Sequence, residues 1–155
     1  AAEPDAALRR QAIHLIGATG DGAALETLYG QLKDADDKAA ALKALGIAGD
    51  DARLARIARS ERDPGLLRAA LEGLGISGGK DATAAIVEIY RATADPGVKR
   101  GAINGLIIAD DGAAILALYR SEPDRDLKRE LMQALSIADS DQALELIDRQ
   151  LSGEQ

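Results

Sequence analysis

Apolar residues recur along this chain at a nearly fixed interval. One set of equivalent positions, here called a column, is apolar in every copy: Ile13, Leu42, Leu71, Ile103 and Met132. Successive members of this column lie 29, 29, 32 and 29 residues apart. Self-similarity at a period of roughly 20–50 residues is typical of repeat proteins, whose units pack against their neighbours. The pattern predicts five units in one domain spanning 1–155, with bounds near 5–33, 34–62, 63–94, 95–123 and 124–151.

Further columns predict two helices in each unit. They are Ile16, Leu45, Leu74, Leu106 and Leu135; Ala18, Ile47, Ile76, Ile108 and Ile137; Leu25, Leu54, Ile86, Ile115 and Leu144; and Leu28, Ile57, Ile89, Leu118 and Ile147. Their spacing of about three residues is that of an amphipathic helix stripe. We expect first helices near 5–17, 36–47, 65–77, 97–109 and 126–138. Second helices are expected near 21–33, 50–60, 81–93, 111–121 and 141–151.

Aspartates mark the expected helix starts. Five aspartates each stand eight positions before a member of the first column: Asp5, Asp34, Asp63, Asp95 and Asp124. Each can cap the helix that follows, and proline follows Asp63 and Asp95 at its favoured place just inside a helix start. Within the units, Gly20-Asp21, Gly49-Asp50 and Asp110-Asp111 mark the turn between the two helices, with Asp81 and Asp141 expected to cap slightly out of register. The three-residue slip at 78–80 is expected to lengthen a turn without disturbing either helix.

Three segments resemble bacterial HEAT-like repeats, short helical pairs also found in phycobilin lyases. They are Asp-Pro-Gly-Val-Lys-Arg-Gly-Ala-Ile at 95–103, Asp-Pro-Gly-Leu-Leu-Arg-Ala-Ala-Leu at 63–71, and Leu-Gly-Ile-Ala-Gly-Asp at 45–50. The resemblance spans all five units. It implies an all-α fold, a right-handed, armadillo-like α-solenoid of about five two-helix repeats. It also implies that an arginine column in the first helices ties adjacent turns together: Arg10, Arg68, Arg100 and Arg129.

Charge and composition exclude several kinds of partner. The formal net charge is −7 and the isoelectric point is about 4.7, so the chain offers no general positive field to nucleic acid or to an anionic membrane. It has no cysteine, and no apolar run approaches the roughly 18 residues of a membrane span. The start at Ala1 without methionine fits either a processed secretory product or a shortened chain, so both cytoplasm and periplasm stay open.

Tyrosines and arginines in the second helices are the candidate partner-binding residues: Tyr29, Arg59, Tyr90, Arg91, Tyr119, Arg120 and Arg149. Two interpretations compete. In the structural one, Arg59, Arg91 and Arg120 pair with aspartates four residues later, and the tyrosines cover the junctions between units. In the functional one, second helices line the concave face of the solenoid, and these side chains form a stripe for an acidic or extended peptide.

Other motifs favour structural roles. Gly73 to Gly78 matches G-x-G-x-x-G, but it closes a helix instead of following a strand, so helix packing and capping explain it and no cofactor is expected. His14 is the only histidine and its column is polar, which indicates a solvent-facing position without a metal. The acidic runs at 34–37 and 139–141 lack the glycine and terminal glutamate of an EF-hand loop, so we interpret them as solvated turns.

The sequence therefore predicts a non-catalytic scaffold module that binds a protein or peptide. Two alternatives come from other classes. One is a structural segment of a longer array, or a monomer that self-associates weakly through its end repeats. The other is a HEAT-like enzyme of the phycobilin lyase or DNA glycosylase type. A base-handling enzyme needs a basic groove and aromatic platforms, whereas this chain is acidic and has neither Trp nor Phe.

Overall fold

A computed structural model describes residues 4–138 and residue 144. Throughout this part of the chain the secondary structure is helical and contains no strand. The first helices of the units are α1 (Pro4–Thr19), α3 (Ala35–Ile47), α5 (Pro64–Ser77), α7 (Pro96–Ile108) and α9 (Arg125–Ala138). The second helices are α2 (Gly22–Gln31), α4 (Asp51–Ser60), α6 (Lys80–Ala92) and α8 (Gly112–Ser121). These bounds match the predicted helices closely, and the predicted helix at 141–151 falls outside the described residues.

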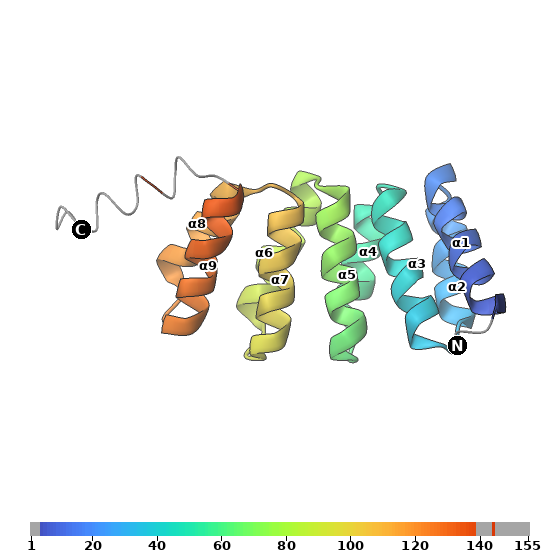
Figure 1. Cartoon of the computed structure of the whole chain (residues 1–155), viewed down its shortest axis with the longest axis horizontal. Coiled ribbons are helices and arrows are strands. Elements are labelled where there is room, and N and C mark those ends of the chain that lie inside the picture. Colours follow the sequence, from blue (N-terminus) through green and yellow to red (C-terminus); the bar gives the residue numbers. More distant parts are fainter. Residues whose placement is uncertain (1–3, 139–143, 145–155) are drawn as a thin grey trace.

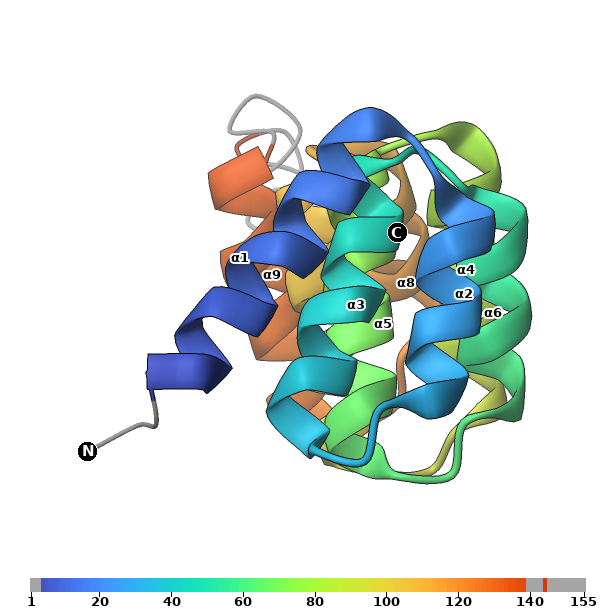
Figure 2. The same ribbon diagram turned by 90° about the vertical axis from the view of Figure 1, so that its right-hand side faces the viewer.

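The helices form two layers (Figures 1 and 2). First helices follow one another in a row, each packed on the next, and second helices make a row behind them. Each second helix also packs on the first helix of its own unit and on that of the next unit. Every unit therefore shares its core with its neighbours, as the repeat pattern predicts and as an α-solenoid requires.

Aspartate caps start most helices. The carboxylate of Asp63 accepts hydrogen bonds from the backbone N–H groups of Gly65 and Leu66 at 2.7 and 3.0 Å, and Asp95 caps α7 in the same way. The remaining described caps are Asp21, Asp34, Asp50, Asp111 and Asp124. Two predicted caps were wrong. Asp5 lies inside the first turn of α1, and α6 begins after Gly79, so Asp81 lies in its first turn.

The three-residue slip extends a helix and not a turn. Helices α2, α4 and α8 have 10 residues each, whereas α6 has 13. Lys80 starts α6 three positions before the residue equivalent to the start of α4, because Gly78, with φ of 67°, already ends α5. The prediction that this slip leaves both helices undisturbed was wrong, and α6 gains most of a helical turn at its N-terminus.

Most residues of the predicted columns are buried or partly buried in the core, except for the isoleucine column and Leu144, which is 60% exposed. Leu45, Leu74 and Leu106 are fully buried in line along the first-helix layer. Ile47, Ile76 and Ile108 are instead 40, 40 and 41% exposed. They follow the central column by two residues, and that rotation of about 200° carries them out of the interface. The isoleucine column was therefore wrongly included in the buried stripe.

Glycines let the first helices approach closely. A Cβ atom on Gly73 would lie 2.6 Å from the carbonyl oxygen of Leu42, and one on Gly105 would lie 2.7 Å from that of Leu71. Neither position has room for a methyl group. The two glycines lie where α5 crosses α3 and where α7 crosses α5. Helix packing is therefore the role of Gly73, the first glycine of the G-x-G-x-x-G match, as predicted.

Candidate functional site

Two of the candidate tyrosines cross the seams, a term used here for the junctions between neighbouring second helices. The hydroxyl of Tyr29 donates to Oε2 of Glu61, and that of Tyr90 donates to Oε2 of Glu122 at 2.5 Å. Each pair joins one unit to the next. The tyrosines therefore cover the seams, as the structural interpretation predicted.

A lysine completes each of these pairs. Lys38 lies over the ring of Tyr29, with Nζ 5.2 Å from the centroid, and Lys99 lies over Tyr90 at 4.7 Å. Lys99 also donates to Glu122 at 2.9 Å. We call this set, in which a tyrosine donates to a glutamate and carries a lysine over its ring, a seam triad. Lys128 likewise lies over the ring of Tyr119, with Nζ 4.9 Å from the centroid.

The acidic members of the triads stay ionised despite their burial. Burial acts to raise the pKa of Glu122, but hydrogen bonds from Tyr90 and Lys99 outweigh it, so the net pKa lies below the ordinary value. Glu61 shows the same balance, with hydrogen bonds from Tyr29 and from the backbone. Burial, followed by the glutamate beside it, raises the pKa of each tyrosine well above its ordinary value. The triads therefore hold fixed charges across the seams at neutral pH.

Arg59 pairs with a different residue from the one predicted. Its guanidinium binds both carboxylate oxygens of Glu88, on the next second helix, at 2.7–3.2 Å. The predicted partner, Asp63, caps α5 instead. The expected pairing of each arginine with the aspartate four residues later is therefore wrong for Arg59, and its ion pair joins α4 to α6.

Arg91 occupies the position equivalent to Arg59 but has no acidic partner. The residue equivalent to Glu88 in the next unit is Ala117, so α8 offers no carboxylate there. Within the described residues Arg91 forms no side-chain hydrogen bond or ion pair, and its side chain is exposed. Arg120 likewise has no such bond within the part of the chain described, and Arg149 lies outside it. Arg91 is therefore a cation available to a ligand.

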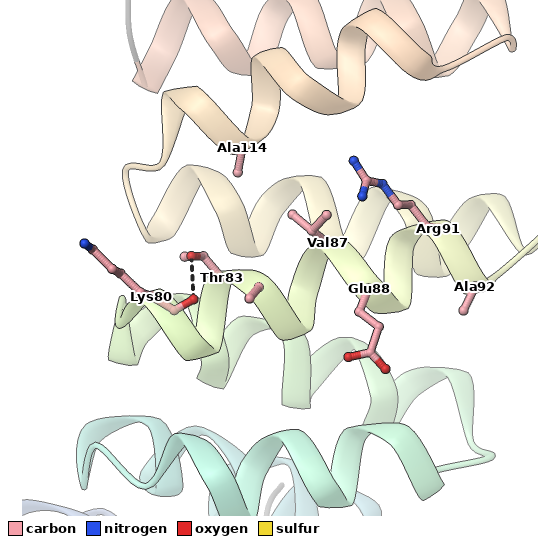
Figure 3. A pocket seen from close by; sticks show the side chains of 8 residues that line it. Lys80, Thr83, Val87, Glu88, Arg91, Ala92 and Ala114 are labelled. Atoms are coloured by element: carbon pink, nitrogen blue, oxygen red, sulfur yellow. Dashed lines mark hydrogen bonds between the residues drawn. The ribbon is translucent and has the colours of Figure 1, made fainter.

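A pocket of about 680 Å³ opens beside Arg91, between α6 and α8 (Figure 3). Lys80 and Arg91 lie at its two ends, and Val87 lies between them. Ala114 of α8 faces these α6 residues across the pocket. Glu88 points away toward α4, where it pairs with Arg59. The pocket thus has a cation at each end, and the α6 residues between them that line it are Thr83, Ala84, Val87 and Glu88. Eleven residues of helix separate the two cations, which corresponds to about 16 Å along the axis.

Sequence reasoning missed Lys80 as a site residue. The signal was the three-residue slip itself, because the extra turn of α6 is what carries Lys80 to the end of this pocket. The slip was instead assigned to a turn, and a turn residue gave no reason to place Lys80 on the same helix as Arg91.

The remaining candidates have structural or solvent-exposed surroundings. His14 is exposed, and no group of three or more metal-ligating side chains occurs within residues 4–138. Asp34 and Asp36 are exposed, but Asp37 is 1% exposed and accepts a 2.9 Å hydrogen bond from Arg9. The solvated-turn interpretation of 34–37 is therefore wrong for Asp37, and the run at 139–141 lies outside the described residues.

The first-helix arginines join neighbouring units at two places. Arg100 bonds Glu130 at 2.9 Å and Arg10 approaches Asp36 at 3.7 Å, each on the following first helix. Arg129 pairs with Asp126 inside its own helix.

None of the helices described is long and apolar enough to cross a membrane.

Comparison with known proteins adds no family assignment. No protein-family model matches the sequence, and no curated protein matches it. Any function must therefore be argued from the arrangement of residues on this chain.

Proposed function

We propose that this chain is a right-handed α-solenoid of five HEAT-like units that binds an acidic, extended segment of a partner protein without catalysis. The binding surface is the second-helix layer. Its central part is the pocket between α6 and α8, and Lys80 and Arg91 contact the carboxylates of the partner.

The unpaired guanidinium of Arg91 is the observation that carries this proposal. At the α4–α6 seam the equivalent arginine is bound by Glu88, and at the α6–α8 seam alanine replaces the glutamate. The chain therefore keeps the cation and lacks its internal partner. An arginine presents a planar fork that binds a carboxylate through two hydrogen bonds. A carboxylate from another molecule would restore at Arg91 the pairing seen at Arg59.

The spacing of the cations defines the expected ligand. An extended chain advances about 3.3 Å per residue, so about five residues span the roughly 16 Å between Lys80 and Arg91. Val87, Ala84 and Ala114 form the apolar part of the wall between them, which Thr83 and the Arg59-paired Glu88 also line. A segment with acidic residues about five positions apart and small or apolar residues between them fits this surface.

Selection from a random peptide library displayed on phage tests the proposal, with the chain as bait. We expect the enriched peptides to carry two acidic residues at this spacing. In calorimetry, Arg91→Glu should lower the affinity for the most enriched peptide by about tenfold or more, since a charge-assisted hydrogen bond is worth about 1.5–3 kcal/mol. Arg129→Glu, the same charge change on a first helix, should leave affinity unchanged. Enrichment of peptides without acidic residues, or equal affinity for both variants, would contradict the proposal.

A second candidate function, association through an end unit, rests on exposed leucines of α1. Leu8 and Leu15 are 63 and 58% exposed. Their equivalents in the third unit, Leu66 and Gly73, are buried against the preceding unit. We propose that this face of α1 packs on a second copy. Sedimentation at rising concentration tests it: wild type should associate, and Leu15→Glu should not. Sedimentation as a monomer throughout would contradict this association.

A further inference from the structure

One seam has lost all three members of the triad together. Tyr29, Lys38 and Glu61 form the set between α2 and α4, and Tyr90, Lys99 and Glu122 form it between α6 and α8. Between α4 and α6 the equivalent positions hold Ala58, Leu67 and Thr93. A long aromatic, a cation and an anion are thus replaced by two apolar side chains and a small hydroxyl.

A pocket lies where the triad is missing. It measures about 360 Å³, and all three replacement residues line it. Ile89 and Ala92 of α6 complete its apolar part. We call this set (Ala58, Leu67, Ile89, Ala92 and Thr93) the α4–α6 notch. Since a tyrosine ring occupies the equivalent place at each neighbouring seam, the notch has room for an aromatic ring.

We infer that the α4–α6 notch binds an aromatic side chain, that of phenylalanine or tyrosine, from a partner peptide. Leu67 and Ile89 offer apolar contact to the ring where Lys38 and Lys99 offer a cation at the other seams. The Oγ1 of Thr93 already accepts a 3.1 Å hydrogen bond from the N–H of Asp95. Its own proton stays free to donate to a phenol oxygen. Both rings fit, and neither requires a charged partner.

The charges at the mouth of the pocket favour an acidic residue beside the ring. Arg59 is held by Glu88, and Glu61 is held by Tyr29 and by the backbone N–H groups of Arg62 and Asp63. Arg62 is exposed and forms no ion pair through its side chain within the residues described. Its guanidinium is therefore the group that a carboxylate next to the aromatic residue can reach.

This inference rests on the proposed function and specifies its ligand further. The pocket that contains the notch and the α6–α8 pocket lie on the two sides of α6, and Glu88 and Ala92 line both pockets. A peptide that crosses α6 can place its aromatic residue in the notch and an acidic residue at Arg91. The two contacts use different helices on the far side, α4 for the ring and α8 for the acidic segment, so they can be tested separately.

Titration of the full chain with N-acetyl-phenylalanine, followed by amide NMR, tests the notch. We expect shifts centred on Ala58, Leu67 and Thr93, with weaker binding of N-acetyl-phenylalaninamide, which lacks the carboxylate, and weaker still of N-acetyl-leucine. The triple substitution Ala58→Tyr, Leu67→Lys and Thr93→Glu rebuilds the triad found at the other seams. It should fold and reduce affinity for N-acetyl-phenylalanine by tenfold or more.

Ala58→Leu is the second variant, since it fills the notch with a smaller change and should weaken binding likewise. Equal affinity in the filled variants, or shifts centred away from the notch, would overturn the inference, as would absence of binding. Arg91→Glu should leave binding of this short probe unchanged. If the probe binds the notch while displayed peptides ignore Arg91, the acidic-segment proposal fails and the aromatic site stands. If displayed peptides depend on Arg91 but the probe does not bind the notch, the aromatic site fails and the acidic-segment proposal stands.

Discussion

The hydroxyl of Tyr90 lies 2.5 Å from Oε2 of Glu122, a residue 32 positions further along the chain that is 5% exposed. The same glutamate accepts from Nζ of Lys99 at 2.9 Å and from the backbone N–H of Asp124 at 3.0 Å. One carboxylate thus satisfies donors from the end of one unit, the start of the next and the connection beyond. Because each donor faces a buried charge, the loss of any one should be measurable.

Tyr90→Phe removes the hydroxyl and keeps the ring. We expect a loss of about 1.5–3 kcal/mol in the free energy of unfolding, the usual worth of a hydrogen bond to a charged group. Urea denaturation monitored by circular dichroism measures it. Tyr29→Phe is the matched control, because Tyr29 donates to a less buried glutamate and should cost less. An equal or larger loss for Tyr29→Phe would show that burial of Glu122 does not set the strength of the bond.

Acid should weaken the seams. The pKa values of Glu61 and Glu122 lie below the ordinary value of 4.5. A lowered native pKa contributes stability that is complete above the unfolded pKa and is lost as pH falls through the native pKa. We expect stability to decline below about pH 4.5. Glu122→Gln should be less stable at pH 7 and show a shallower decline. An identical slope for both proteins would exclude Glu122 as a source of acid sensitivity.

Two positions on α5 separate the core from the exposed isoleucine column. Leu74→Ala should cost about 2–5 kcal/mol, because Leu74 is fully buried and alanine leaves a cavity. Ile76→Ala should cost less than about 1 kcal/mol, since Ile76 is 40% exposed. Chemical denaturation of both variants gives the comparison. A cost below 1 kcal/mol for Leu74→Ala would mean that the column of Leu45, Leu74 and Leu106 is not the core.

The helix crossings predict opposite effects for one substitution at two glycines. Gly73→Ala would bring a methyl group 2.6 Å from the carbonyl oxygen of Leu42 and 2.9 Å from Cδ2 of Leu54. Such overpacking costs about 1–3 kcal/mol. Gly30→Ala in α2 meets nothing within 4 Å. It should stabilise the protein by about 0.5–1 kcal/mol, because alanine favours helix over glycine. Thermal unfolding of both variants decides the matter, and a stabilised Gly73→Ala would refute close packing of α3 and α5.

The features predicted correctly from sequence are those set by near neighbours in the chain or by repetition of one position in every unit. Asp63 caps α5 because its carboxylate reaches N–H groups two and three residues on, and Leu74 is buried because its column repeats in every unit. The partner of Arg59 was missed for the opposite reason. Glu88 lies 29 residues away from Arg59. Asp63, four residues from Arg59, is the acidic partner that sequence spacing predicts, but its carboxylate caps α5 instead.

Two further errors came from tertiary context. Ile76 extends the apolar stripe in sequence, and only the placement of the neighbouring helices shows that the stripe stops at Leu74. Asp37 belongs to a polar run, yet its column contains Leu66, Val98 and Leu127. The signal for the burial of Asp37 lies in that column, because the equivalent residues in the later units are apolar. The candidate site required both the comparison of equivalent positions and the contacts of the fold. Ala117 becomes informative only because the equivalent Glu88 pairs with Arg59.

The close approach of helices at Gly73 and Gly105 also gives the units a fixed order. At each crossing a glycine of one unit packs against the backbone of the preceding unit, so each of these units fits only the unit that now precedes it. If a genetic rearrangement moved the first unit into third place, Leu15 would stand where Gly73 now meets the carbonyl of Leu42. The repeats look interchangeable in sequence, but they could not be shuffled, duplicated or recombined freely without redesigning the contact on each side.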